Sequence, residues 1–357
     1  ECDVQNLTLS SLRLILLCAA LGGLTGCSTL GFYSQAVSGH MALMRARVPV
    51  AESLADPDLD PEIRQKLEIA RDARRFALDT LGLPDNGSYT AWVDLGRPAV
   101  TWNVVATERF SVDPLRWCFP IAGCLSYRGY FDRADAVDYA DRLAEQGYDT
   151  TVSGATAYSS LGWFKDPLVT TMFRGDDASL ASVLFHELAH QQLYVGDDSS
   201  FNESFATFVE MVGVDLWLEA TDRRELLEPW LDRRARRDDF IALLSDARVG
   251  LQAGYARGGT ESELTAFKEA AFAELKRDYQ ALRTQWGGYT GYDWWFDKTL
   301  NNAHLAGVAT YTQWVGAFAA LFERVDRDFG AFFAAAAELA ELPIDERRTR
   351  LVALSTE

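Results

Sequence analysis

The sequence contains few histidines, few cysteines and few positive charges, and each scarcity excludes certain classes of site or partner. Its 357 residues include 4 His and 5 Cys, and 34 Lys and Arg against 52 Asp and Glu give a formal net charge of −18. No basic stripe offsets this charge, so nucleic acid phosphates would be repelled and we expect no nucleic acid partner. The apolar run at residues 14–24 is too short to span a bilayer, which needs about 20 residues.

Two of the four histidines stand at a spacing typical of a metal site. They frame the pentapeptide His186-Glu187-Leu188-Ala189-His190. On an α-helix, residues four apart lie on one face, so the two imidazoles can hold one metal ion. Glu187 lies about 100° around such a helix, beside the metal as a base rather than on it. A helix is indicated by apolar residues at three- and four-residue steps, at Leu180, Val183, Leu184, Leu188 and Leu193.

A third ligand is available at Glu203, thirteen residues after His190. The linking segment 195–200 holds a Gly suited to ending one helix, and Asp and Ser residues suited to capping the next. We expect the first helix to run about five residues, or about 7 Å, past His190. Glu203 would then lie about one turn into an antiparallel helix, level with both histidines. Two His and one Glu, with a fourth position left to water, form the ligand set of a catalytic zinc site.

Other interpretations of these residues remain open. The two histidines could share a helix surface by chance. Glu203 could form a capping box with Ser200, in which its side chain folds back on the start of its own helix. Glu210, seven residues further on and on the same face, is the reserve ligand. If Glu210 is not a ligand, it either hydrogen-bonds a ligand side chain or is an ordinary surface residue.

The segment 186–210, HELAHQQLYVGDDSSFNESFATFVE, resembles the bacterial putative aminopeptidase family. These are lipoprotein metallopeptidases with the signature H-E-x-x-H…N-E-x-x-A, and the similarity extends over most of the chain after its N-terminal segment. More broadly the pattern is similar to the gluzincin class, whose ligand Glu usually stands further from the second His. Further family-like stretches are WCFP at 117–120, YRGYF at 127–131, AYSSLGWF at 157–164, DP at 166–167 and NNA at 301–303.

The resemblance implies a zinc-dependent metallopeptidase acting on a peptide or protein substrate. It would hold one zinc ion on His186, His190 and Glu203, and hydrolyse peptide bonds by a zinc-bound water that Glu187 activates. Aminopeptidase action follows from the family name, but the aminopeptidase signature G-x-M-E-N is absent and no amine-binding residue can be assigned. The alternative is a catalytically silent metal-binding or scaffold lipoprotein of the cell envelope.

A further donor should stabilise the oxyanion that forms during peptide hydrolysis. In gluzincins this donor is a Tyr or His from later in the chain. The candidates here are His304 and Tyr311, with Tyr127 and Tyr130 behind them. The remaining histidine, His40, is far from the motif in sequence and is expected to serve packing or the surface.

The first 26 residues resemble a lipoprotein signal peptide. The apolar run 14–24 follows Arg13 and suits the apolar region of a signal peptide. Leu24-Thr25-Gly26-Cys27 is similar to a bacterial lipobox, in which the Cys is lipidated and becomes the mature N-terminus; a short buried helix is the alternative. The resemblance implies a lipid on Cys27 that holds the protein to the outer or inner membrane, facing the periplasm. Ser28 favours the outer membrane.

Cys118 and Cys124 are expected to form a disulfide. Cys2 and Cys18 would leave with the signal peptide, and Cys27 would carry the lipid. The remaining even pair would then lie in an oxidising compartment. The bond would close a small loop between two strands, and two buried thiols are the alternative.

We expect one catalytic unit over residues 27–357, of the α+β class and dominated by helices. Residues 27–175 would form a mixed part with a small sheet, and residues 176–357 a helical part with the zinc site. Residues 168–171 are either an edge strand that pairs with substrate backbone or an ordinary connecting strand. The aromatic segment 287–297 is either a rim for apolar substrate side chains or a packed surface loop. The expected strands are 91–93, 101–106, 115–121, 125–131 and 149–153, and the expected helices are 31–47, 61–83, 135–146, 222–247, 261–285, 301–322 and 329–342.

Overall fold

The computed structural model of the chain describes residues 31–119, 123–308 and 313–355. Helices dominate these residues and the strands form small sheets, so the expected helix-dominated α+β class is confirmed. The predicted signal peptide, Cys27 and Tyr311 lie outside the described residues. Within the described ranges, no helix combines the length and the apolar character needed to cross a membrane.

The described elements mix strands and helices up to Phe173 and are helical beyond it. The strands are β1 (Val48–Pro49), β2 (Ala91–Val93), β3 (Thr101–Thr107), β4 (Trp117–Phe119), β5 (Gly123–Leu125), β6 (Arg128–Tyr130), β7 (Asp149–Ala155) and β8 (Leu168–Val169). Residues 31–45 are helical. The other helices are α2 (Val50–Ala55), α3 (Pro61–Asp79), α4 (Arg133–Glu145), η1 (Thr170–Phe173), α5 (Asp177–Gln192), α6 (Ser199–Ala220), η2 (Arg224–Leu226), α7 (Leu227–Ala256), α8 (Glu261–Gln285), α9 (Asp293–Phe296), α10 (Asn302–Leu305), α11 (Val315–Arg324), α12 (Phe329–Glu341) and α13 (Ile344–Ser355).

Two three-stranded sheets and one hairpin replace the single small sheet that we expected. One sheet has the order β1-β2-β8, the other has the order β6-β3-β7, and β4 pairs with β5. The expected strand 125–131 divides because the chain changes partner within it: Leu125 pairs with β4, whereas Arg128 pairs with Val104 of β3. Of the expected strand 168–171, only Leu168 and Val169 form a strand, because η1 begins at Thr170. This short β8 lies at the edge of its sheet, and both of its residues are fully buried.

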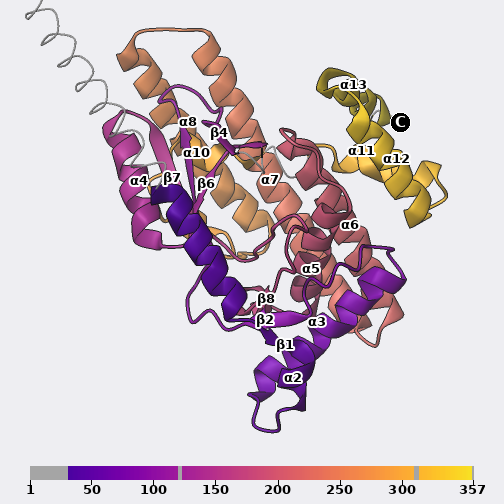
Figure 1. The fold of residues 1–357 in the computed structure, drawn as a ribbon. Coiled ribbons are helices and arrows are strands. Elements are labelled where there is room, and N and C mark those ends of the chain that lie inside the picture. Colours follow the sequence, from indigo (N-terminus) through magenta and orange to yellow (C-terminus); the bar gives the residue numbers. More distant parts are fainter. Residues whose placement is uncertain (1–30, 120–122, 309–312, 356–357) are drawn as a thin grey trace, which may run out of the picture.

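The main hydrophobic core surrounds α5 and α6, which lie side by side at the centre of the molecule (Figure 1). Helix α3 packs on α5, and α11 packs on α6. The two central helices approach closely at Gly213, where a Cβ would lie 2.8 Å from Leu81 Cδ1 and 2.9 Å from Phe185 Cδ2. A side chain at this point of α6 would therefore force Leu81 and Phe185 to shift.

Two smaller cores support the main one. Helix α4 covers the β6-β3-β7 sheet, with Val104, Ala136 and Ala140 buried between them. The α7–α8 pair buries Phe240 and Tyr279 together with Trp295 and Phe296 of the aromatic segment. Of the two alternatives for residues 287–297, the structure therefore favours the packed loop, although Trp294 is exposed.

The C-terminal helices depart from expectation in two places. The predicted helix 301–322 is not continuous, because Asn301 caps the short α10 and a separate helix α11 begins at Val315. Helix α13 was not predicted, because the charged residues of its first half obscure the apolar pattern. It forms because Arg347, Leu351 and Leu354 make a buried stripe at four- and three-residue steps.

Candidate metal centre

Helix α5 carries both motif histidines. Asp176 caps its start by accepting a hydrogen bond from the Ser179 backbone N–H at 3.0 Å. The helix ends at Gln192, two residues after His190, and not five as we expected. It ends early because the backbone of Val195 bonds to the Asn202 side chain, which draws the chain away from the helix axis.

The link between α5 and α6 fixes the position of Glu203. Asn202 is buried; its Oδ1 accepts from the Val195 N–H at 2.8 Å and its Nδ2 donates to the Val195 carbonyl at 2.7 Å. Asp198 caps α6 by accepting from the Phe201 N–H at 3.2 Å. Ser200 therefore has no capping role, and the capping-box alternative for Glu203 is wrong. The Glu203 carboxylate is turned toward the histidines instead.

His186, His190 and Glu203 converge on one point. Glu203 Oε2 lies 3.2 Å from His186 Nε2 and 3.6 Å from His190 Nε2, and the two Nε2 atoms are 3.2 Å apart. A tetrahedral zinc ion with ligand bonds of about 2.0–2.1 Å would hold its ligand atoms about 3.3 Å from one another. The donor types and their spacing thus fit a single metal ion.

Glu210 stands behind His186 and not among the converging atoms. Its Oε2 lies 3.1 Å from His186 Nδ1, and its Oε1 accepts from Ser182 Oγ at 2.6 Å and from Arg237 Nη1 at 3.2 Å. A carboxylate on the far nitrogen fixes the ring so that Nε2 faces the metal position. Glu210 is therefore better placed to orient a ligand than to serve as the reserve ligand.

The carboxylates around His186 favour the protonated form of its ring. Desolvation lowers the pKa of His186, but its bonds to Glu203 and Glu210 outweigh this effect and raise the pKa to about 10. Burial alone would raise the pKa of Glu203, yet the bonds to His186 and His190 hold it at about 2. A protonated His186 between two carboxylates shows that this pocket stabilises positive charge.

Metal uptake should therefore release about one proton even at about pH 8, because a ligand imidazole must be neutral. The affinity should rise about tenfold per pH unit until the pH approaches the His186 pKa of about 10. Zinc titration calorimetry in buffers of different ionisation enthalpy measures the released proton. Glu210→Gln removes one of the two carboxylates and should reduce the release at this pH. Zinc binding without proton release by the unchanged chain would contradict the prediction.

Two tyrosines flank the converging side chains. Desolvation and then the Glu203 carboxylate raise the pKa of Tyr127 well above its usual range, with further contributions from Tyr194 and Glu187, although 39% of the residue is exposed. The Tyr194 ring lies 6.4 Å from the His190 ring, and desolvation and Glu203 also raise its pKa. Tyr194 was missed in the sequence; its position four residues after His190 was the available signal.

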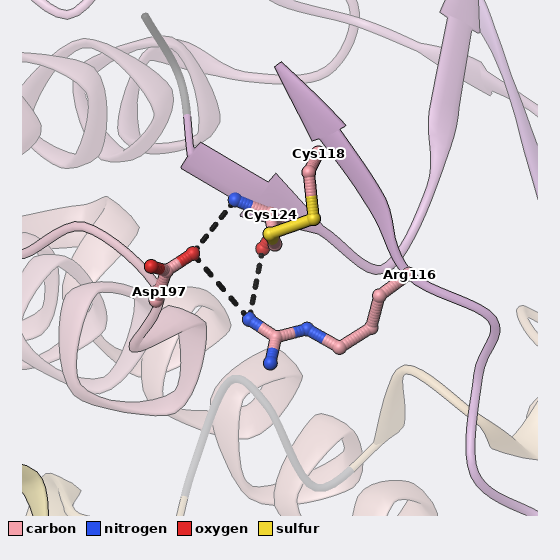
Figure 2. The surroundings of a disulfide bond; sticks show 4 residues. All are labelled: Arg116, Cys118, Cys124 and Asp197. Atoms are coloured by element: carbon pink, nitrogen blue, oxygen red, sulfur yellow. Dashed lines mark hydrogen bonds and ion pairs between the residues drawn. A yellow bond between two sulfur atoms is a disulfide. The ribbon is translucent and has the colours of Figure 1, made fainter. Parts of the chain in front are cut away.

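A disulfide-bonded hairpin supports Tyr127. Cys118 of β4 is bonded to Cys124 of β5, and Figure 2 shows how Asp197 in the α5–α6 link holds this hairpin. Asp197 Oδ1 accepts from the Cys124 N–H at 2.7 Å and from Arg116 Nη2 at 3.5 Å, and Arg116 also donates to the Cys124 carbonyl at 3.3 Å. The strand end that leads to Tyr127 is thus attached to the segment that positions Glu203.

The comparison with known families agrees with the extent of this fold. A family model described as Putative aminopeptidase matches residues 31–351. The chain belongs to the Putative aminopeptidase family. Neither the curated proteins nor the solved structures provide a match. Membership of this family identifies the chain, at a coarse level, as a peptidase, and its His186, His190 and Glu203 are compatible with a bound metal ion.

Behind Glu187, this aminopeptidase-family chain has a buried polar group that the sequence did not reveal. Asp166 accepts from the Ser160 N–H at 2.8 Å and from Gln191 Nε2 at 3.4 Å. Burial raises the pKa of Asp166 to about 6, and the Glu187 carboxylate adds to the rise. Burial and Glu187 likewise raise the pKa of the Tyr89 hydroxyl. The Asp166 carboxyl thus titrates closer to neutral pH than an exposed aspartate, beside the carboxylate of the motif base.

The other candidate residues are engaged elsewhere in this family member. The Nε2 atom of His304 lies 3.2 Å from Thr151 Oγ1, and its Nδ1 atom lies 2.8 Å from Asn301 Oδ1. The pKa of His304 is lowered to about 4, and burial is the largest cause of this shift. Tyr130 is buried in the core beneath α4. His40 Nδ1 lies 2.7 Å from the Tyr158 hydroxyl, and its ring packs on Phe164. The Glu203 carboxylate thus acts on the pKa of Tyr127 but is not among the causes that shift the pKa of His304.

Proposed function

We propose that this chain is a zinc-dependent peptidase that hydrolyses peptide bonds with Glu187 as its base. The observation that supports the proposal is the convergence of His186, His190 and Glu203 at distances that suit one ion, with Glu187 beside them on α5. A zinc ion held there would lower the pKa of a water molecule from about 15.7 toward about 7 and polarise the peptide carbonyl.

Glu187 then carries out the proton transfers. Its carboxylate accepts a proton from the attacking water while the water oxygen bonds to the carbonyl carbon. When the carbon–nitrogen bond breaks, the same carboxyl group gives the proton to the leaving amine.

Tyr127 is our candidate for the oxyanion donor in place of His304. A tyrosine hydroxyl is protonated at neutral pH and can donate a hydrogen bond to the carbonyl oxygen, and burial and then the Glu203 carboxylate raise the pKa of Tyr127 further. The hairpin that precedes Tyr127 is attached to Asp197, in the link that leads to Glu203. A fixed donor of this kind stabilises the negative charge that develops on the substrate oxygen.

Tyr127→Phe is expected to lower kcat by about 10²–10³-fold with unchanged zinc content, because it removes one oxyanion donor and no ligand. Steady-state kinetics and metal analysis of the purified chains measure both quantities. Tyr289→Phe, in the aromatic segment, is the matched control and should behave as the unchanged chain. A normal kcat for Tyr127→Phe together with a loss for Tyr194→Phe would transfer the role to Tyr194.

Product analysis tests the function as a whole. The zinc-loaded chain is incubated with a peptide library whose members have free or acetylated N-termini, and the products are identified by mass spectrometry. Stepwise loss of residues from free N-termini alone supports the aminopeptidase action that the family description names. Internal cleavage assigns an endopeptidase. Zinc binding without any cleavage favours the catalytically silent metal-binding or scaffold protein.

We also propose that the protein is anchored in the cell envelope by a lipid on Cys27, facing the periplasm. The lipobox-like Leu24-Thr25-Gly26-Cys27 supports this location, and so does the Cys118–Cys124 disulfide, since such bonds persist in oxidising compartments. Metabolic labelling with palmitate should mark the chain, and Cys27→Ser should abolish the label. An unlabelled wild-type chain would refute the anchor without bearing on the peptidase.

A further inference from the structure

An exposed apolar stripe runs along the helix at residues 31–45. Tyr33, Val37 and Met41 follow one another at four-residue steps and therefore share a face. All three are exposed, Val37 to 62%. The opposite face of this helix is buried in the protein, at Phe32 and Leu43. In Figure 1 the helix lies along one side of the molecule.

A second segment extends the stripe. Trp163 and Phe164 are exposed to 69% and 54%, and the Phe164 ring packs 4.4 Å from the ring of His40 on the same helix. We name the five residues Tyr33, Val37, Met41, Trp163 and Phe164 the apolar stripe. Such a cluster of exposed large side chains is typical of a binding surface.

The two segments that carry the apolar stripe have a net charge opposite in sign to that of the whole protein. Residues 31–51 and 150–165 contain no Asp or Glu, although the chain has 52 acidic residues. The same segments contain Arg45, Arg47 and Lys165, and Arg47 Nη1 donates to the Lys165 carbonyl at 2.8 Å. Exposed aromatic residues next to basic ones suit the interface of an anionic membrane, where Trp and Tyr lie at headgroup level.

The proposed lipid anchor would bring a membrane to this helix. Three residues, 28–30, separate Cys27 from the start of the helix at Gly31. At about 3.5 Å per extended residue, the lipid attachment point stays within about 14 Å of Gly31. The bilayer that holds the lipid is therefore the large apolar partner nearest to the apolar stripe.

We propose that the apolar stripe docks on the surface of the phospholipid bilayer that anchors the chain, with Arg45, Arg47 and Lys165 facing anionic headgroups. The proposal rests on the proposed lipid anchor and not on the peptidase chemistry. Docking would also orient the metal centre, because the segment with Trp163 packs on the end of α5, where a Cβ at Gly162 would lie 3.8 Å from Gln191 Cβ. The site would then face the periplasm at a fixed height above the membrane.

Spin labels on the intact lipidated chain test this docking. Val37→Cys places a nitroxide in the apolar stripe, and Ser38→Cys places one on the adjacent exposed position outside it. The chains are reconstituted in vesicles of phosphatidylethanolamine and phosphatidylglycerol, and compared with the same chains in detergent. The label at position 37 should gain access to oxygen and lose access to a water-soluble nickel chelate severalfold, whereas the label at position 38 should stay accessible to nickel.

Three results would overturn the proposal. Equal nickel access at both positions in anchored protein would show that the stripe does not touch lipid. Spin–spin broadening at position 37 would assign the stripe to a second copy of the chain. Failure of the wild-type chain to enter vesicles would remove the anchor and the docking together. Peptide cleavage, measured separately, is expected to be present in every case, so these results are distinct from a failure of the peptidase proposal.

Discussion

Glu187→Gln should lower kcat by about 10²–10⁴-fold, the contribution usual for a general acid–base group, and leave the metal content unchanged. The amide keeps the size of the side chain but cannot accept the proton of the attacking water. Glu187 is not among the converging atoms, so the ligand set of His186, His190 and Glu203 remains complete. Peptide turnover and zinc content of the purified variant measure the two effects.

Two companion variants separate the base from the ligands. Glu203→Gln should lose zinc as well as activity, because it replaces a carboxylate that lies within 3.2 Å and 3.6 Å of the two imidazoles. Glu219→Gln, at an exposed position of α6, should leave both quantities unchanged. Equal turnover by Glu187→Gln and the unchanged chain would refute the mechanism, and full zinc content in Glu203→Gln would refute the ligand set.

Arg347→Met should lower the free energy of unfolding by about 3–5 kcal/mol, the cost of breaking a buried ion pair by removing one partner. Arg347 of α13 and Asp198 are 5% and 4% exposed, and Nη1 lies 2.5 Å from Oδ2. Without the guanidinium, Asp198 would be a buried carboxylate with no neutralising charge at the start of α6. Urea denaturation followed by circular dichroism measures the change.

The double variant and a surface control complete this experiment. Asp198→Asn removes the charge that Arg347→Met leaves unpaired, so the two changes together should cost less than the sum of the single ones. Arg75→Met, at an exposed pair with Asp72, should leave the denaturation midpoint nearly unchanged. A midpoint for Arg347→Met equal to that of the unchanged chain would show that the pair is not needed.

Local spacing was sufficient to predict that His186, His190 and Glu203 converge. His186 and His190 follow from the helical repeat, and Glu203 follows from one turn of return helix after a link with capping residues. The length of α5 was wrong because the Asn202 bonds to Val195 are made across the link, and no periodicity indicates them. The long helix α8 was predicted at its observed bounds, since it has clear periodicity and the capping box of Thr260 and Glu263.

Tertiary contacts account for the predictions that failed. We sought the oxyanion donor after the motif in sequence and placed His304 first. The structure favours Tyr127, which precedes the motif. Tyr127 follows a hairpin that is attached to the α5–α6 link by the hydrogen bond from Cys124 to Asp197, two residues that are distant in sequence. Helix α13 escaped prediction for a similar reason, because its Arg347 becomes a core residue only when Asp198 neutralises it.

The hairpin of β4 and β5 makes the centre depend on the oxidation state of its surroundings. Each strand has three residues, and a two-stranded hairpin of this size is marginally stable in water unless something else holds it. Before the cysteines are oxidised, His186, His190 and Glu203 would already have their places on α5 and α6, whereas the hairpin before Tyr127 would be held by the contacts of Asp197 and Arg116 alone. In the proposed mechanism and location, a newly made copy would therefore gain its full activity only after it has left the reducing cytosol.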